Sequence, residues 1–322
     1  MTVPLVDLTP WFDGSDAGRA AVASRVDDAL RESGFLLVTG HGVPEGLPEA
    51  VRTHARRFFG LAGERKARYA VPVGGRGWLP PGAETNAHSE GTETPPDLKE
   101  SYSVGADQPT GDPEIDGFWF QPNVWPDDDV PELRAAAIEY MTRMRALSDE
   151  LLRVCAVALG LAVEHFTDHT GAPTYTFNIN WYPPRTHVGT PGENQFRIGP
   201  HTDFGTVTLL DREPGAGGLQ VFTKDGEWVD APYEPSALTV NIGDLMARWT
   251  GDRWRSCRHR VLPPPASAPD EELMSLVWFY ETDPHARISS LAPPIGRRDH
   301  PPVTAHEYLL EKIRSIGVGQ PD

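Results

Sequence analysis

The amino-acid sequence predicts a mainly β protein with flanking helices, in which a sandwich or jelly-roll core follows an α/β N-terminal region. Two observations lead to this fold class. Roughly eight short alternating runs, separated by turn residues, follow residue 174, as in antiparallel sandwiches and jelly rolls. Apolar runs with strand or helix spacing occupy residues 3–59, ahead of that core. The 322 residues suffice for one large domain or two ordinary ones.

The N-terminal part of the chain is predicted to combine a buried strand, helices and long loops. Residues 34–40 form an apolar run bounded by glycines, which predicts a buried strand, and 47–59 have helical spacing. Residues 71–131 are rich in Pro, Gly and Asp but carry many aromatic side chains, which favours a packed cover over a disordered linker. We divide the chain into an N-terminal region, 1–130, and a core region, 131–322.

The core region is predicted to consist of one long helix, eight strands and a closing helix. Apolar residues recur every three or four positions over 132–161, so this helix is expected to pack along a sheet. A last helix is predicted at 306–316. The strands are expected at 175–182, 196–201, 206–210, 218–222, 228–229, 238–242, 254–261 and 275–280.

Composition excludes several classes of function. The net charge of −17 opposes the field of a polyanion, so no nucleic-acid partner is expected. No apolar run approaches the ~20 residues that span a bilayer, so no membrane partner is expected either. Met1–Asp7 has neither a basic nor a long apolar segment, and Cys155 and Cys257 are expected to be reduced core residues, so we expect a cytoplasmic protein. The oligomeric state is left undetermined.

A metal site is indicated by two histidines and one aspartate. Side chains two residues apart on an extended backbone project from the same face, about 6.6 Å apart, so His201 and Asp203 can converge on one ion. His259 lies several predicted strands later and supplies a third ligand. Two histidines and a carboxylate on one face of a metal are the arrangement of non-haem Fe(II) oxygenases. The same ligands also suit Zn(II) with a bound water, so hydrolysis stays open at this point.

Seven segments, in chain order, carry a resemblance that covers nearly the whole sequence. They are Val3–Leu8, Gly34–Val43, Phe58–Lys66, Asn180–Pro184, His201–Asp203, Asn241–Asp244 and His259–Val261. In these segments the chain resembles the Fe(II)/2-oxoglutarate dioxygenases of the isopenicillin N synthase-like branch, which includes oxygenases of secondary metabolism. The resemblance implies a double-stranded β-helix core, with His201, Asp203 and His259 as iron ligands. It also implies Fe(II) as cofactor, 2-oxoglutarate and O2 as co-substrates, and a small-molecule substrate.

One position departs from the family pattern. An Arg-x-Ser pair on a late strand normally holds the distal carboxylate of 2-oxoglutarate, assisted by the tyrosine of an Asn-x-Tyr motif. The resemblance therefore implies roles for Ser275 and Tyr182, but Leu273 occupies the position of the arginine. A carboxylate desolvated without a cation costs several kcal/mol. Either another cation substitutes, or the co-substrate differs.

Two arginines are candidates for the substitute cation. By strand parity Arg197 lies on the same face as His201 and Asp203, and Arg255 lies on the same face as His259. The alternative is that each arginine forms a structural ion pair. A one-residue bulge would also reverse the parity.

The substrate side of the predicted site is less defined. The resemblance places residues 76–84 and Ser101-Tyr102 in the substrate-facing region, whereas aromatic-rich segments also serve as core packing. The net negative charge of the chain mildly favours a cationic, zwitterionic or neutral substrate over an anion.

The sequence is compatible with three alternative functions. The first is a non-haem Fe(II) oxygenase that uses 2-oxoglutarate to hydroxylate, desaturate or cyclise a small molecule. The second, favoured by Leu273, is an oxidase of the isopenicillin N synthase type that needs no 2-oxoglutarate. The third is a non-catalytic jelly-roll binding protein, which the intact His201, Asp203 and His259 argue against.

Overall fold

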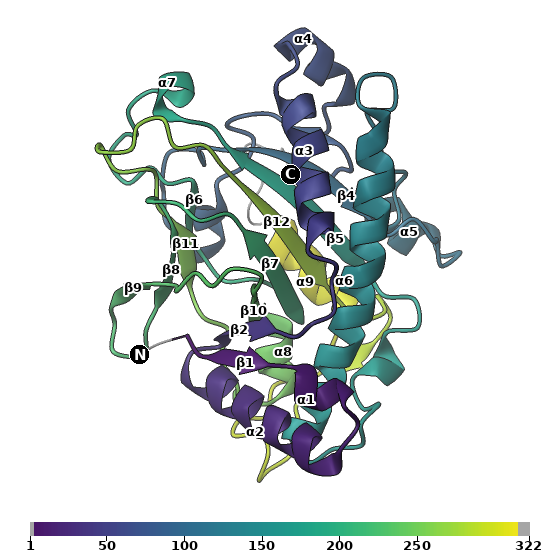
Figure 1. Cartoon of the computed structure of the whole chain (residues 1–322). Coiled ribbons are helices and arrows are strands. Elements are labelled where there is room, and N and C mark those ends of the chain that lie inside the picture. Colours follow the sequence, from purple (N-terminus) through teal and green to yellow (C-terminus); the bar gives the residue numbers. More distant parts are fainter. Residues whose placement is uncertain (1–2, 315–322) are drawn as a thin grey trace.

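The computed structural model describes residues 3–314, which form two main β-sheets with helices around them (Figure 1). The major sheet contains, in spatial order, β1 (Leu5–Asp7), β2 (Phe35–Thr39), β10 (Leu238–Ile242), β7 (Val207–Arg212), β12 (Leu273–Tyr280), β5 (Tyr175–Tyr182), β4 (Glu100–Gly105) and β3 (Trp78–Leu79). The minor sheet contains β6 (Ile198–His201), β11 (His259–Val261), β8 (Leu219–Phe222) and β9 (Trp228–Asp230). A small hairpin pairs β13 (Arg287–Ile288) with β14 (Val303–Thr304).

The eight predicted core strands are all present, and the jelly-roll fold class is confirmed. β5 and β10 have the expected bounds, but β11 begins only at residue 259. The preceding segment runs against an N-terminal helix instead: the buried Trp254 donates its Nε1–H to Asp27, and the Arg255 main-chain N–H bonds to the carbonyl of Leu30.

Nine α-helices surround the sheets within residues 3–314. They are α1 (Thr9–Phe12), α2 (Asp16–Glu32), α3 (Gly46–Phe59), α4 (Gly63–Lys66), α5 (Pro113–Trp119), α6 (Pro131–Ala158), α7 (Arg185–Val188), α8 (Asp244–Trp249) and α9 (Ala305–Arg314). None of the helices in this part of the chain is long and apolar enough to cross a membrane. The predicted closing helix matches α9, and its last two expected positions, 315 and 316, lie outside the described residues.

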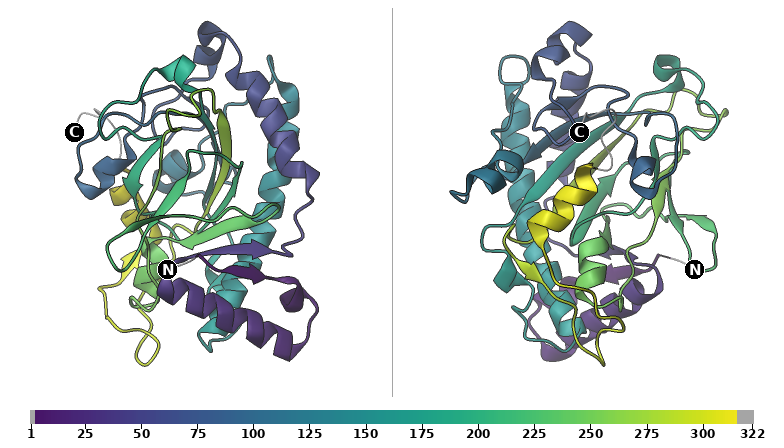
Figure 2. Two further views of the ribbon diagram at one scale, coloured as in Figure 1. Left: turned by 60° about the vertical axis from the view of Figure 1, so that its left-hand side comes forward. Right: turned by 180° about the vertical axis from the view of Figure 1, so that it is seen from behind.

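The long helix α6 packs along the outer face of the major sheet, as expected, with α3 beside it (Figure 1). Its apolar stripe is buried, and Ser148 on the same side accepts a hydrogen bond from Trp278 of β12 at 3.0 Å. Phe59 of α3 stacks on Trp181 of β5. Helix α9 lies on the opposite side of this sheet from α6 (Figure 2). The minor sheet and α9 therefore cover the inner face of the major sheet.

Strands from the N-terminal region extend both edges of the major sheet. β1 and β2 join β10 on one side, and β3 and β4 join β5 on the other. The aromatic side chains of the irregular segment, among them Trp78, Tyr102 and Trp119, are buried, as expected for a packed cover. Both regions thus contribute to one sheet, and the division at residue 130 stays a prediction.

Candidate active site

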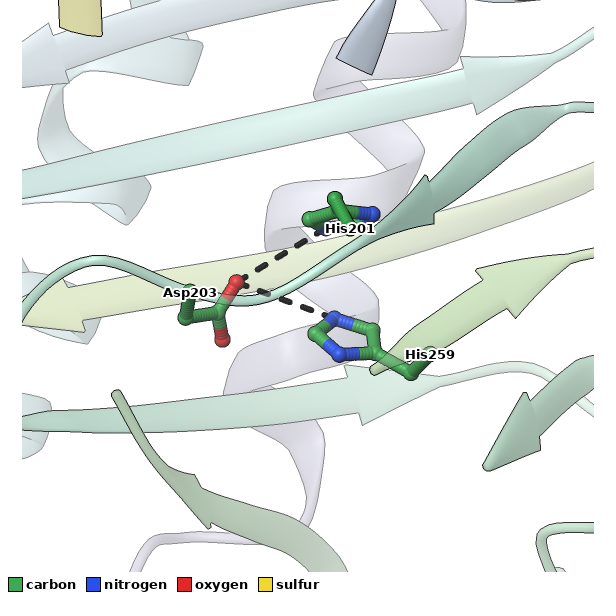
Figure 3. A group of neighbouring side chains, drawn as sticks. All are labelled: His201, Asp203 and His259. Carbon is green, nitrogen blue, oxygen red and sulfur yellow. Dashed lines mark ion pairs between the residues drawn. The ribbon is translucent and has the colours of Figure 1, made fainter. Parts of the chain in front are cut away.

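His201, Asp203 and His259 meet between the two sheets (Figure 3). His201 ends β6, Asp203 follows in the connection to β7, and His259 begins β11 as the cross-strand partner of His201. One ligand atom from each residue lies within 4.8 Å of the others. The Asp203 Oδ1 atom is 3.7 Å from the Nε2 atom of each histidine. The structure therefore brings together the three residues that the sequence singled out.

Hydrogen bonds behind the three side chains fix which atoms face one another. The Nδ1 atom of His201 is 2.8 Å from the carbonyl oxygen of Gly199, and that of His259 is 3.2 Å from the carbonyl oxygen of Cys257. Because a carbonyl oxygen only accepts, each Nδ1 carries the proton and each Nε2 presents its lone pair. Asn241 donates to Oδ2 of Asp203 at 2.6 Å, which leaves Oδ1 directed toward the histidines.

Burial sets the charges of this group. It lowers the pKa of His259 to about 4, helped by the neighbouring His201, and it lowers the pKa of His201 as well. For Asp203, burial acts to raise the pKa, but the two histidines and the Asn241 hydrogen bond outweigh it and lower the pKa. At neutral pH the group therefore consists of two neutral imidazoles and one carboxylate. This donor set fits a divalent first-row metal such as Fe(II).

One cavity opens from this group and runs along β12 between the sheets. Leu273 and Ser275 of β12, with Tyr182 of β5, line one end of it. Glu281, just after β12, lines the other end together with Arg76, Trp119 and Leu309. His201, Asp203 and His259 line this same cavity.

Comparison with known proteins identifies the family. A model for the N-terminal part of the non-haem dioxygenase in morphine synthesis matches residues 3–128, and the 2OG-Fe(II) oxygenase superfamily model matches residues 173–282. The chain belongs to the 2OG-Fe(II) oxygenase superfamily. It is a 2-oxoglutarate-dependent dioxygenase acting on a small molecule, with Fe(II) as cofactor and O2 as co-substrate. The resemblance seen in the sequence is confirmed.

Relatives of this 2OG-Fe(II) oxygenase act in bacteria and fungi. Validamycin A dioxygenase of Streptomyces hygroscopicus subsp. limoneus is 42% identical over 316 residues, which cover 97% of this chain and 86% of the relative. The 2-oxoglutarate-dependent dioxygenase tropC of Talaromyces stipitatus is 32% identical over 80% of this chain and 81% of its own length. These relatives favour the 2-oxoglutarate-dependent interpretation over the oxidase and the non-catalytic binding protein.

Solved structures agree with the fold of this oxygenase. A Neurospora crassa enzyme in complex with α-ketoglutarate and thymine superposes with a TM-score of 0.84 at 26% identity, covering 97% of this chain and 96% of that one. A putative 2OG-Fe(II) oxygenase from Caulobacter crescentus superposes with a TM-score of 0.82 at 26% identity, covering 97% and 98%.

In this oxygenase the residues expected to hold the distal carboxylate of 2-oxoglutarate lie together. Tyr182 is the cross-strand partner of Leu273 on β12, and its hydroxyl forms a hydrogen bond with Ser275. Burial raises the pKa of Tyr182, so its hydroxyl is a neutral donor. Leu273 packs against the chain at Gly215, where an added Cβ would lie 2.5 Å from the Leu273 Cδ1 atom.

The two arginines proposed from strand parity do not lie in the cavity wall. β6 contains a bulge, so that Val261 pairs with Ile198 instead of Gly199. As a result Ile198, and not Arg197, lies on the same face as His201. The prediction from strand parity was therefore wrong for Arg197. Arg197 is buried beside the wall, and its Nη1 lies 2.8 Å from Glu271 Oε1. Arg255 lies against α2, outside the regular strand, and is not brought to the cavity.

Other cavity residues escaped the sequence reasoning. Arg212, at the end of β7, lines the cavity, but the predicted strand stopped at residue 210 and left it out. The segment 76–84 is divided: Arg76 and Glu84 line the cavity, whereas the Trp78 indole donates to the buried Glu100. The sequence carries no alternation signal for Arg212, because residues 211–213 are all charged.

Proposed function

We propose that this dioxygenase binds Fe(II) through His201, Asp203 and His259 and oxidises a small polar molecule related to validamycin A. The observation that carries the metal assignment is the convergence of the three donor atoms within 4.8 Å at the wall of a cavity. Fe(II) held there supplies, with 2-oxoglutarate and O2, the oxidant that removes a hydrogen atom from the substrate.

The protein's own groups orient the site. The carbonyl oxygens of Gly199 and Cys257 hold the two imidazole rings, and Asn241 occupies one oxygen of Asp203. These three residues would hold Fe(II) from one side and would leave it accessible to the co-substrates. Tyr182 and Ser275, at one end of the cavity, would donate hydrogen bonds to the distal carboxylate of 2-oxoglutarate, and the substrate would then occupy the other end.

The substrate end supports a polar, hydrogen-bonding molecule. Hydroxyl and amide side chains alternate along its wall, together with two aromatic rings; they are Ser103, Thr174, Thr176, Asn178, Phe118 and Trp119. A relative at 42% identity over nearly the whole chain is named for its action on validamycin A. Hydroxylation, desaturation and cyclisation are all compatible with removal of a hydrogen atom from such a substrate.

We further propose that the enzyme acts in the cytoplasm and without a nucleic-acid partner. A net charge of −17 supports the second point, because it opposes a polyanion. Two buried cysteines without a disulfide support the first.

The test is an anaerobic reconstitution with Fe(II), followed by addition of O2, 2-oxoglutarate and validamycin A. We expect succinate to form in step with a product that has gained one oxygen atom or lost two hydrogen atoms, as measured by mass spectrometry. Asp203→Ala should form neither. Succinate formation that does not increase with validamycin A would reject the substrate class while leaving the dioxygenase activity in place.

A further inference from the structure

We propose that Arg212 binds the distal carboxylate of 2-oxoglutarate in place of the arginine that is missing at Leu273. The inference rests on the assignment of Tyr182 and Ser275 to that carboxylate in the proposed function. A dicarboxylate buried in a protein needs a cation or several donors at each charged end. The residues around this end of the cavity identify which cation is available.

Arg212 is placed opposite Ser275. The two residues are cross-strand partners in the β7–β12 ladder, and directly opposed side chains on one face have Cβ atoms about 4.5–5.5 Å apart. Arg212 also shares its face with Thr208 and Leu210, and both of these residues line the cavity. Arg212 therefore belongs to the same cavity wall as Ser275 on the adjacent strand, and Tyr182 lies one strand further along the sheet.

The other cations near this cavity are already neutralised or lie elsewhere. Lys99 lines the cavity but is ion-paired with Glu84. Arg197 lies over the Tyr182 ring, 5.6 Å from its centroid, but it does not line the cavity and is ion-paired with Glu271. Arg76 belongs to the opposite end, where it donates to Thr176 at 2.9 Å.

Arg212, in contrast, forms no ion pair within residues 3–314. Its two acidic neighbours in sequence, Asp211 and Glu213, are paired with Arg52 and Arg56 of α3. The Arg212 side chain is partly desolvated, and this burial lowers its pKa. A carboxylate in the cavity would offset that cost.

The guanidinium of Arg212 is held in place but has donors to spare. Its Nη2 atom donates to the carbonyl oxygen of Ala231 at 2.9 Å and to that of Pro232, just after β9. Its Nε and Nη1 atoms donate to none of the residues that the structure describes. An arginine has five N–H donors, so an anchored Arg212 can still bind an anion.

Direct binding measurements test this role. Anaerobic Fe(II)-loaded protein is titrated by calorimetry with 2-oxoglutarate and with 2-oxovalerate, which has a methyl group in place of the distal carboxylate. We expect Arg212→Gln to weaken 2-oxoglutarate binding by about ten- to 150-fold and to leave 2-oxovalerate binding unchanged. Arg260→Gln is the matched control, because Arg260 hydrogen-bonds Gln220 and does not line the cavity.

Additional variants separate the possible outcomes. Leu273→Arg, added to Arg212→Gln, should restore 2-oxoglutarate binding by returning a cation to the same end. Equal weakening of both ligands by Arg212→Gln would overturn the proposal and show a structural role. If Tyr182→Phe and Ser275→Ala weaken 2-oxoglutarate binding and Arg212→Gln does not, the role of Arg212 is rejected, whereas the assignment of this cavity end to 2-oxoglutarate is kept. If none of the three variants affects it, the assignment of this cavity end fails as well.

Discussion

His201 and His259 are directly opposite each other in the β6–β11 ladder, and their ring centroids are 4.2 Å apart. The two imidazoles belong to neighbouring strands of the minor sheet, whereas Asp203 lies in the connection from β6 to the major sheet. A metal ion bound by all three side chains would link these segments to one another. Metal binding should therefore be coupled to stability.

Metal addition should raise the melting temperature. A ligand that binds only the folded state stabilises it by ~2.7 kcal/mol at a hundred times its dissociation constant. We expect anaerobic Fe(II) to raise the Tm of the wild-type protein in calorimetry, and Asp203→Ala to abolish this shift. Glu234→Gln, in the exposed β9–β10 loop, is the control and should keep it. An unchanged shift in Asp203→Ala would contradict the metal assignment.

Glu271→Gln should destabilise the protein strongly. Glu271 neutralises the buried Arg197 and also accepts the main-chain N–H of Gly217 at 2.9 Å. Removing one partner of a buried ion pair costs about 3–5 kcal/mol. Urea denaturation should show this loss. Glu272→Gln, which breaks an exposed pair with Arg56, is the control and should cost about 0–1 kcal/mol; equal losses would argue against the structural role of Arg197.

Glu281→Gln should change how stability depends on pH. Burial raises the pKa of Glu281 well above its usual value of 4.5, and the charge of Asp203 adds to this. The folded state then holds the proton more tightly than the unfolded state, so its stability is highest below the unfolded pKa and falls as pH rises. The metal-free variant should exceed wild type in unfolding free energy at pH 8, by ~1.4 kcal/mol per unit of pKa shift, and match it near pH 4. Denaturation midpoints across this range provide the measurement, and a constant difference would contradict the prediction.

Gly105→Ala should damage the substrate end of the cavity. A Cβ at Gly105 would overlap the guanidinium of Arg76, which is buried and hydrogen-bonded to Thr176. Overpacking of this kind costs about 1–3 kcal/mol, and we expect the substrate KM to rise while the dissociation constant of 2-oxoglutarate is unchanged. Gly117→Ala, in α5 with open space around the added Cβ, is the control. A rise in both constants would place Arg76 outside the substrate end.

Local pattern was sufficient to locate the strands and the pair of His201 and Asp203, whereas His259 was assigned with the help of the family resemblance. Alternating polarity located β5 and β10, and the spacing of His201 and Asp203 on extended backbone indicated a shared ligand face. These inferences need only neighbours in sequence. They succeeded because the period of a strand determines the direction of each side chain.

Local sequence pattern could not identify the cation near the distal carboxylate of 2-oxoglutarate. The β6 bulge shifted Arg197 by one residue, and the late start of β11 removed Arg255 from the strand on which its parity depended. The pairing of Arg212 with Ser275 joins residues that are distant in sequence, so only the sheet register reveals it. Register is a tertiary property that one sequence does not specify.

The burial of Cys257 and Cys155 limits the oxidation of their thiols by the oxidants that this enzyme class generates. Cys257 lies two residues before His259, but its side chain is buried in a small apolar cluster behind Phe35 and Leu219; these two residues line the cavity, whereas Cys257 does not. Burial raises the pKa of Cys257 and raises the pKa of Cys155 to about 12. Oxidation of cysteine proceeds through the thiolate, which is scarce at neutral pH for both residues. We therefore do not expect thiol oxidation to limit the working lifetime of this oxygenase when oxygen is activated without a substrate.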